Sequence, residues 1–226
     1  MKVLVSDFDK TFYPDNFVDN IKEINRFVDL GNTFIIATGR NFKSLKSRID
    51  TYNIKYSYLI CNDGSVIYDK NNNIIKKNNI KKETVLKLID FISLYFDNVL
   101  LDDGYTLVKE ASDTIDGIFV EFNDYDTALQ VINKVNANFD DVHGYLSQNY
   151  INIVSIDSSK GLAIKYLELL NDYKNIHVVG DGINDISMFE YYKGFSLFNS
   201  IEELKVLAHY HVDDFIDVIN YMKRGS

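Results

Sequence analysis

The stretch VSDFDKTF, residues 5–12, ends an apolar run and places Asp7 and Asp9 one residue apart. Alternate side chains of a β-strand point to the same face, so two carboxylates at this spacing face the same side of an extended chain. Their mutual repulsion must be offset by a metal ion, a proton or water. Which of these applies depends on the polar residues that the rest of the chain brings to the same place.

Composition and charge limit the class of protein. The chain has 226 residues, of which 46% are hydrophobic and 25% charged, as in one large or two small globular domains. Lys and Arg number 24 against 33 Asp and Glu, a formal charge of −9. Because binding to nucleic acid is driven by basic patches, this balance argues against a nucleic-acid partner.

Cysteine content and hydropathy indicate the compartment. Cys61 is the single cysteine, so no internal disulfide can form, which fits a reducing cytosol. No apolar stretch approaches the length of a membrane span, and the beginning of the chain is too short and too soon acidic to resemble a signal peptide. We therefore expect a cytoplasmic protein with no membrane partner, either a monomer or a weak homodimer.

Hydrophobic periodicity predicts an α/β core formed by residues 1–80 and 155–226. Apolar strands alternate there with helices of 3.6-residue spacing, and this alternation is typical of parallel βαβ units in a doubly wound, Rossmann-like sheet. The expected strands and the expected hairpin are 2–9, 32–40, 56–64, 65–69 with 73–77, and 175–185 running into a loop; the expected helices are 20–31, 41–53, 158–171, 185–193 and one from about Asp213.

The pattern changes between residues 81 and 154. A helix over 81–96 is followed by a strand, a turn at Asp103-Gly104 and a second strand, and residues 119–122 can extend that sheet. A helix over 124–138 and a strand pair within 142–157 complete an αββαββ pattern. We interpret this segment as an α+β domain inserted into the first.

Polar residues follow the core strands. Ligands of doubly wound sheets bind at the edge where the strands end. The polar residues at the expected strand ends are Asp7, Asp9, Thr38, Asp181 and Asp185. Lys160 lies near a helix start and can join them. Carboxylates, one hydroxyl and one ammonium suit Mg²⁺ and a phosphoryl group, because oxygen ligands hold the ion and cations hold the phosphate.

The order of these residues resembles the haloacid dehalogenase superfamily of phosphohydrolases. DFDKT (7–11) resembles its DxDxT motif, FIIAT (34–38) its second motif, Lys160 in SSKG its third, and GDGIND (180–185) its fourth. The insert lies between the second and third motifs, as in the type IIB cap of Cof-type sugar-phosphate phosphatases. ATGR (37–40), CNDG (61–64) and LFNSIEELKVLA (197–208) also resemble that branch. Lys10 and Asp63 stand where Gly is common, and Phe12 where Leu is common.

The resemblance implies a Mg²⁺-dependent phosphatase of small phosphorylated metabolites, with sugar phosphates as the first candidates. Asp7 would be the nucleophile that forms an aspartyl-phosphate, and Asp9 the general acid and base. The implied metal ligands are the Asp7 and Asp181 carboxylates and the Asp9 carbonyl, with Asp185 in support. The implied phosphate- and substrate-binding residues are Thr38, Gly39, Arg40, Lys160 and Asn184.

Other interpretations remain open at this point. Arg40 suits a substrate contact and a structural ion pair about equally, and Tyr105 and Tyr145 of the insert can face the site. The same motifs occur in a phosphotransferase or mutase, which differs in its acceptor. A phosphoacceptor signalling module and a catalytically silent sugar-phosphate-binding protein are further alternatives.

Overall fold

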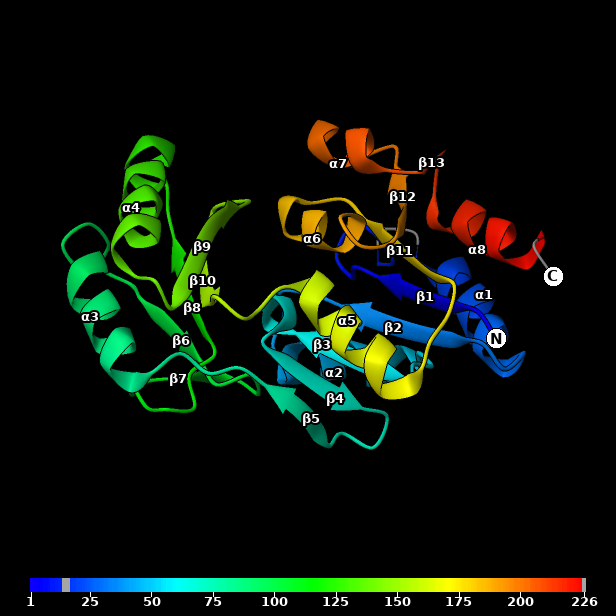
Figure 1. Ribbon diagram of the computed structural model, residues 1–226, viewed down its shortest axis with the longest axis horizontal. Helices are drawn as coiled ribbons and strands as arrows, with labels where there is room; N and C mark the ends of the chain where they lie inside the picture. Colours follow the sequence, from blue (N-terminus) through cyan, green and yellow to red (C-terminus); the bar gives the residue numbers. More distant parts are fainter. Residues whose placement is uncertain (14–16, 225–226) are drawn as a thin grey trace.

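The computed structural model describes residues 1–13 and 17–224, which form two α/β units that lie side by side (Figure 1). The larger unit, the core, contains an eight-stranded sheet. Its strands are β1 (Val3–Ser6), β2 (Thr33–Ala37), β3 (Tyr58–Cys61), β4 (Val66–Asp69), β5 (Ile74–Lys77), β11 (Ile176–Gly180), β12 (Lys193–Leu197) and β13 (Tyr210–Val212). Their order across the sheet is β13-β12-β11-β1-β2-β3-β4-β5. Neighbours are parallel from β13 to β3, and β4 and β5 continue the sheet as an antiparallel hairpin.

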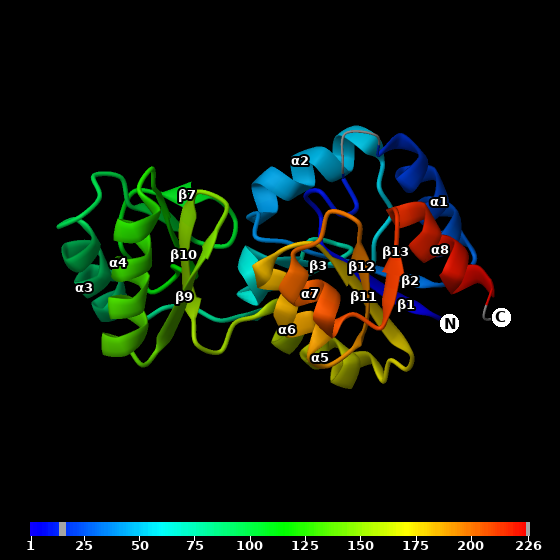
Figure 2. The ribbon, with the colours of Figure 1, turned by 90° about the horizontal axis from the view of Figure 1, so that it is seen from above.

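Helices cover both faces of this sheet (Figure 2). On one face lie α1 (Val18–Asp29), α2 (Phe42–Tyr52) and α8 (Phe215–Arg224); on the other lie α5 (Lys160–Asn171), α6 (Ile186–Phe189) and α7 (Glu202–Leu207). Each face has its own apolar cluster, because a strand buried on both sides needs apolar residues at every position. In α1, Ile21, Ile24 and Phe27 recur at helical spacing and are buried against the sheet. The prediction of a doubly wound parallel sheet is confirmed.

The first strand is shorter than predicted. β1 ends at Ser6, and the chain turns within the acidic motif, where Lys10 has a φ of 63°. The turn is closed by the Tyr13 N–H, which donates to the Phe8 carbonyl at 2.8 Å. Asp7 and Asp9 are therefore carried by a strand end and a turn, and the simple alternation along a strand does not relate them.

The smaller unit, which we call the cap, is a five-stranded antiparallel sheet with two helices. Its elements are α3 (Lys82–Ile92), β6 (Leu100–Asp102), β7 (Leu107–Val108), β8 (Gly117–Glu121), α4 (Tyr125–Asn138), β9 (Val142–Ser147) and β10 (Tyr150–Ser155). Both helices lie on the sheet face that points away from the core (Figure 2). Three strands follow α3, because β8 adds to the predicted pair as residues 119–122 suggested. The limits of the insert at 81 and 154 remain a prediction.

Two other sequence features can be followed in the described residues. Cys61 is a free, buried side chain that packs in the apolar cluster of the core. Among the helices of residues 1–13 and 17–224, none is long and apolar enough to cross a bilayer.

A buried polar cluster joins the two units. Asn62, in the short 3₁₀ turn η1 (Asn62–Gly64), donates its side-chain N–H groups to Asp102 Oδ1 at 2.9 Å and Asp116 Oδ1 at 2.7 Å. Asp102 also accepts hydrogen bonds from the Asn41 side chain and the Gly104 N–H. Asp116 is fully buried, and no hydrogen bond to its Oδ2 is found among the described residues. Burial therefore raises the pKa of Asp116 to about 7, despite the hydrogen bond from Asn62.

This pKa gives the stability of the protein a pH dependence of defined sign. The folded state holds the Asp116 proton up to a pH of about 7, whereas the unfolded chain loses it near 3.8. The folded state thus binds more protons across this window, so the group's contribution to the free energy of unfolding falls as the pH rises from 4 to 7.

We expect Asp116→Asn to remove this loss. Urea unfolding should give similar free energies of unfolding for the variant and the wild type at pH 4. At pH 8 the variant should be more stable by up to about 4 kcal/mol, because each pKa unit corresponds to about 1.4 kcal/mol. The control Asp90→Asn changes an exposed carboxylate of α3 and should leave the pH profile as in the wild type. A difference between Asp116→Asn and wild type that does not grow with pH contradicts the assignment.

Candidate active site

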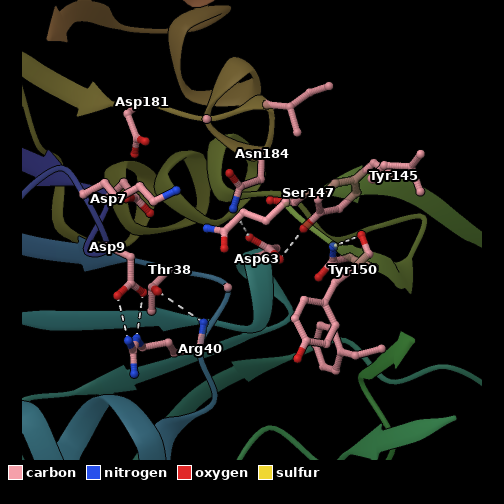
Figure 3. Close-up of a pocket in the computed structure, with 18 of the residues that line it drawn as sticks. Asp7, Asp9, Thr38, Arg40, Asp63, Tyr145, Ser147, Tyr150, Asp181 and Asn184 are labelled. Carbon is pink, nitrogen blue, oxygen red and sulfur yellow. Dashed lines mark hydrogen bonds and ion pairs between the residues drawn. The ribbon is translucent and has the colours of Figure 1, made fainter. Parts of the chain in front are cut away.

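The candidate site is a cavity of about 1210 Å³ between the core and the cap. The core contributes Asp7, Asp9, Thr38 and Asp181, while the cap sheet contributes aromatic and polar side chains such as Tyr145 (Figure 3). Asp7, Thr38 and Asp181 directly follow β1, β2 and β11, three neighbouring parallel strands. Parallel strands end at the same edge of a sheet, so this topology brings the three side chains together.

Lys160 is a buried cation in contact with two carboxylates. Its Nζ is 2.6 Å from Asp7 Oδ1 and 2.7 Å from Asp185 Oδ1, and none of the residue is exposed. Burial alone disfavours the charged ammonium, but Asp185 and Asp7 outweigh it, so the pKa of Lys160 is raised and the group stays charged. Removal of one partner from such a buried ion pair leaves an uncompensated charge.

The backbone holds Lys160 at the start of α5. Ser159 is the N-cap of this helix, and its hydroxyl accepts the Leu162 N–H at 3.1 Å. Gly64, with a φ of +100°, packs against the Ser159 carbonyl so closely that a Cβ there would lie 2.1 Å from the oxygen. A glycine at this place lets the turn after β3 approach the helix start.

Three aspartates form a group that fits a metal ion. Asp7, Asp181 and Asp185 each offer a carboxylate oxygen, and these atoms all lie within 4.8 Å of one another. Burial raises the pKa of Asp7, and its carboxylate neighbours add to the effect while Lys160 opposes it. Burial likewise raises the pKa of Asp181. Such crowded oxygens are the ligands that Mg²⁺ prefers, and a cation would relieve their repulsion.

The three aspartates are not equivalent. Both Asp185 oxygens have partners: Oδ1 accepts from Lys160, and Oδ2 accepts the Asp181 and Gly182 N–H groups at 2.9 Å each. Asp181 Oδ1 accepts the Thr11 hydroxyl at 2.8 Å. No hydrogen bond to the second oxygen of Asp7 or of Asp181 is found in the described part of the chain. These two carboxylates are therefore better placed than Asp185 to bind an ion directly.

Arg40 is engaged by Asp9. Its Nε and Nη2 donate to the two Asp9 oxygens, each at 2.7 Å, and the Asp9 hydrogen bonds raise the pKa of the guanidinium. Both side chains line the cavity and are about one-third exposed, at 30% for Arg40 and 38% for Asp9. Of the two roles left open for Arg40, the structure shows the ion pair, and this pair fixes the Asp9 carboxylate.

Asp63 lies in the same cavity, although the sequence did not single it out as a site residue. Its Oδ1 accepts the Asn184 side-chain N–H at 2.8 Å, and its Oδ2 accepts the Tyr145 hydroxyl of the cap (Figure 3). The carboxylate also packs on Gly39, whose position would put a Cβ 3.1 Å from Oδ2. Asp63 follows β3, so the strand-end rule that located Thr38 could have located it too.

The two tyrosines of the insert that were candidates for facing the site differ in position. Tyr145 lines the cavity, whereas Tyr105 is half exposed and stacks on Phe42. Thr11, the threonine of the first motif, was missed as a supporting residue. Its position within DFDKT was the available signal.

Comparison with known proteins agrees with this geometry. A family model for haloacid dehalogenase-like hydrolases matches residues 4–112 and 102–215. A 5-amino-6-(5-phospho-D-ribitylamino)uracil phosphatase of Bacillus subtilis is 23% identical, over 96% of this chain and 92% of that protein. Among solved structures, a haloacid dehalogenase-like hydrolase from B. subtilis has a TM-score of 0.86, at 17% identity and 99% coverage of both chains. A subclass IIB sugar phosphatase has a TM-score of 0.80, at 16% identity and 99% coverage of both.

We expect Lys160→Met to destabilise the protein by about 3–5 kcal/mol at pH 8, because Asp7 and Asp185 lose their buried cation. The loss should shrink at pH 5, since burial raises the pKa of Asp7 and a protonated Asp7 needs no cationic partner. Urea unfolding at both pH values measures it. The matched control is Lys174→Met, which breaks an exposed pair with Asp172 and should cost far less than Lys160→Met. If both variants lose the same free energy of unfolding, the buried ion pair contributes no more to stability than an exposed one.

Proposed function

Because the chain belongs to the family of haloacid dehalogenase-like hydrolases, we propose that it hydrolyses phosphate monoesters of small metabolites, with Asp7 as the nucleophile. The observation that carries the proposal is the buried contact of Lys160 with Asp7 and Asp185, whose carboxylates group with that of Asp181. This arrangement combines a carboxylate nucleophile with a fixed positive charge. Phosphoryl transfer depends mainly on such positioning and charge stabilisation.

The first half-reaction would form an aspartyl-phosphate. An Asp7 oxygen attacks phosphorus, the ester P–O bond breaks, and Asp9 in its acid form donates a proton to the leaving alkoxide. Lys160 and the Thr38 hydroxyl hold phosphoryl oxygens as charge redistributes. Asn184 is a further contact for the phosphate.

The second half-reaction would regenerate the enzyme. Asp9, now a carboxylate, takes a proton from water as the water oxygen bonds to phosphorus. The bond between the Asp7 oxygen and phosphorus breaks, and inorganic phosphate leaves. Arg40 keeps the Asp9 carboxylate in place through its two hydrogen bonds. We thus assign Arg40 to positioning of the Asp9 carboxylate, and the acid form in the first half-reaction requires that Arg40 release one Asp9 oxygen.

The donor set also supports Mg²⁺ as the cofactor. The carboxylates of Asp7 and Asp181 and the Asp9 carbonyl would hold the ion, and Asp185 would orient Asp181 through its backbone contact. When bound, the ion supplies positive charge for the phosphoryl oxygens. The carboxylates present here fit that role.

Sugar phosphates are our first candidates for the substrate. A sugar phosphatase shares the fold, and a relative is named for a phosphorylated ribityl compound, which is also a polyol phosphate. This choice rests on analogy with these two proteins. We likewise propose a cytoplasmic enzyme that works as a monomer or weak homodimer.

The roles of Asp7 and Asp9 can be separated with two leaving groups. We expect Asp7→Asn to reduce phosphate release at least about 1000-fold with both p-nitrophenyl phosphate and glucose 6-phosphate. Asp9→Asn should still give a rapid burst of nitrophenol equal to the enzyme, since that leaving group needs no proton, and should accumulate phospho-Asp7 visible by intact mass. With glucose 6-phosphate the same variant should show no burst.

The control is Asp97→Asn, which changes an exposed carboxylate of the cap and should retain wild-type rates. Full activity of a folded Asp7→Asn variant would overturn the proposal. A wild-type phospho-enzyme that persists for hours would favour the signalling module, and phosphate found on an added sugar alcohol would favour a transferase. EDTA should abolish turnover, and Mg²⁺ should restore it.

A further inference from the structure

Asp63 places a negative charge in the wall of the cavity. Only 4% of the residue is exposed, and both oxygens accept hydrogen bonds from neutral groups, those of Asn184 and Tyr145. None of the ion pairs found between described residues involves Asp63. A neutral side chain could also bond to these groups, so hydrogen bonding by itself does not require a carboxylate here.

The positive charges of the cavity are already engaged or lie near the phosphate site. Arg40 is bound by Asp9, and Lys160, which is buried behind Asp7 and does not line this cavity, by Asp7 and Asp185. Lys10 follows Asp9 in the acidic motif. None of these cations comes from the cap.

The cap side of the cavity has the opposite character. Its neutral lining includes the rings of Phe119 and Tyr150 and the amides of Gln148 and Asn152. The one charged cap residue among the described lining residues is Asp102, an anion. A leaving group that extends from the phosphate site toward the cap therefore meets carboxylates and neutral groups, and the described lining residues of the cap include no cation to bind a second negative charge.

From this arrangement, and resting on the proposed function, we propose that Asp63 is a specificity residue that selects phosphate monoesters with uncharged, hydroxyl-bearing leaving groups. A second phosphate or a carboxylate on the leaving group would be repelled, since like charges brought together in a binding site cost several kcal/mol. A substrate hydroxyl can donate to the Asp63 carboxylate in the way that the Tyr145 hydroxyl does. The neutral rings and amides of the cap suit the same kind of group.

Matched substrate pairs test this selectivity. Glycerol 3-phosphate and 3-phosphoglycerate differ in one carboxylate, as do glucose 6-phosphate and 6-phosphogluconate. We expect kcat/KM for the member with the uncharged leaving group to exceed that of the member with the carboxylate by at least about tenfold in each pair. This is less than the full effect of like charges brought together in a binding site.

Two variants connect the ratio to Asp63. Asp63→Asn keeps the size and removes the charge, while Asp63→Gly removes the side chain and suits the backbone, since Asp63 has a left-handed φ of 52°. In both variants the neutral-to-anionic ratio should fall by about fivefold or more. Any displacement of Asn184 would slow both members of a pair alike and leave the ratio unchanged. The control Glu203→Gln alters an exposed lining carboxylate, which solvent screens, and should change the ratio less than twofold.

The outcomes separate the two proposals. If no member of either pair is hydrolysed, the proposed function fails. If the esters are hydrolysed but the anionic members react as fast as the neutral ones, the phosphatase stands and the selectivity is refuted. A tenfold ratio that survives in both Asp63 variants would equally overturn the assignment to Asp63.

Discussion

The buried ammonium of Lys160 is the contact on which the arrangement of the site depends. It is bound by carboxylates from two segments of the core, Asp7 after β1 and Asp185 at the end of η2 (Ile183–Asp185). Without this charge, the carboxylates after β1 and β11 would repel one another in a place from which water is largely excluded. A single cation thus makes a cluster of acids compatible with burial, and the cluster retains oxygens that can bind an ion or a phosphoryl group.

The sheet topology makes this contact possible. Strands β11, β1 and β2 are parallel neighbours, so their last residues meet at one edge, and α5 begins at the same edge. The cap then closes the side of the cavity that the core leaves open (Figure 3). Under the proposed function, the core would supply the charged groups that act on a phosphate, while the cap would supply most of the neutral surface for the rest of a substrate. Chemistry and recognition would then be divided between two units of one chain.

Much of this could be predicted because the signals are local. Apolar runs that end in Asp7, Thr38 and Asp181 identify strands and their polar ends within a few residues. The partners of side chains are set by the folded chain, and these were harder to predict. Asp63 and Tyr145 are 82 residues apart in sequence, and the choice of Asp9 as the partner of Arg40 follows from a turn. That turn requires a left-handed conformation at Lys10, which lysine adopts rarely and propensity does not indicate.

The second connection between the two units is short. β10 ends at Ser155 and α5 begins at Lys160, so the returning segment 156–159 leads from the cap sheet directly to the ammonium in the site. A longer segment would no longer fix the position of the start of α5 relative to the cap. Surface loops tolerate insertions and deletions well. Among related proteins we therefore expect them in the distant loops of the cap and not in this segment. The length of this linker therefore helps to set the position of Lys160 relative to the cap.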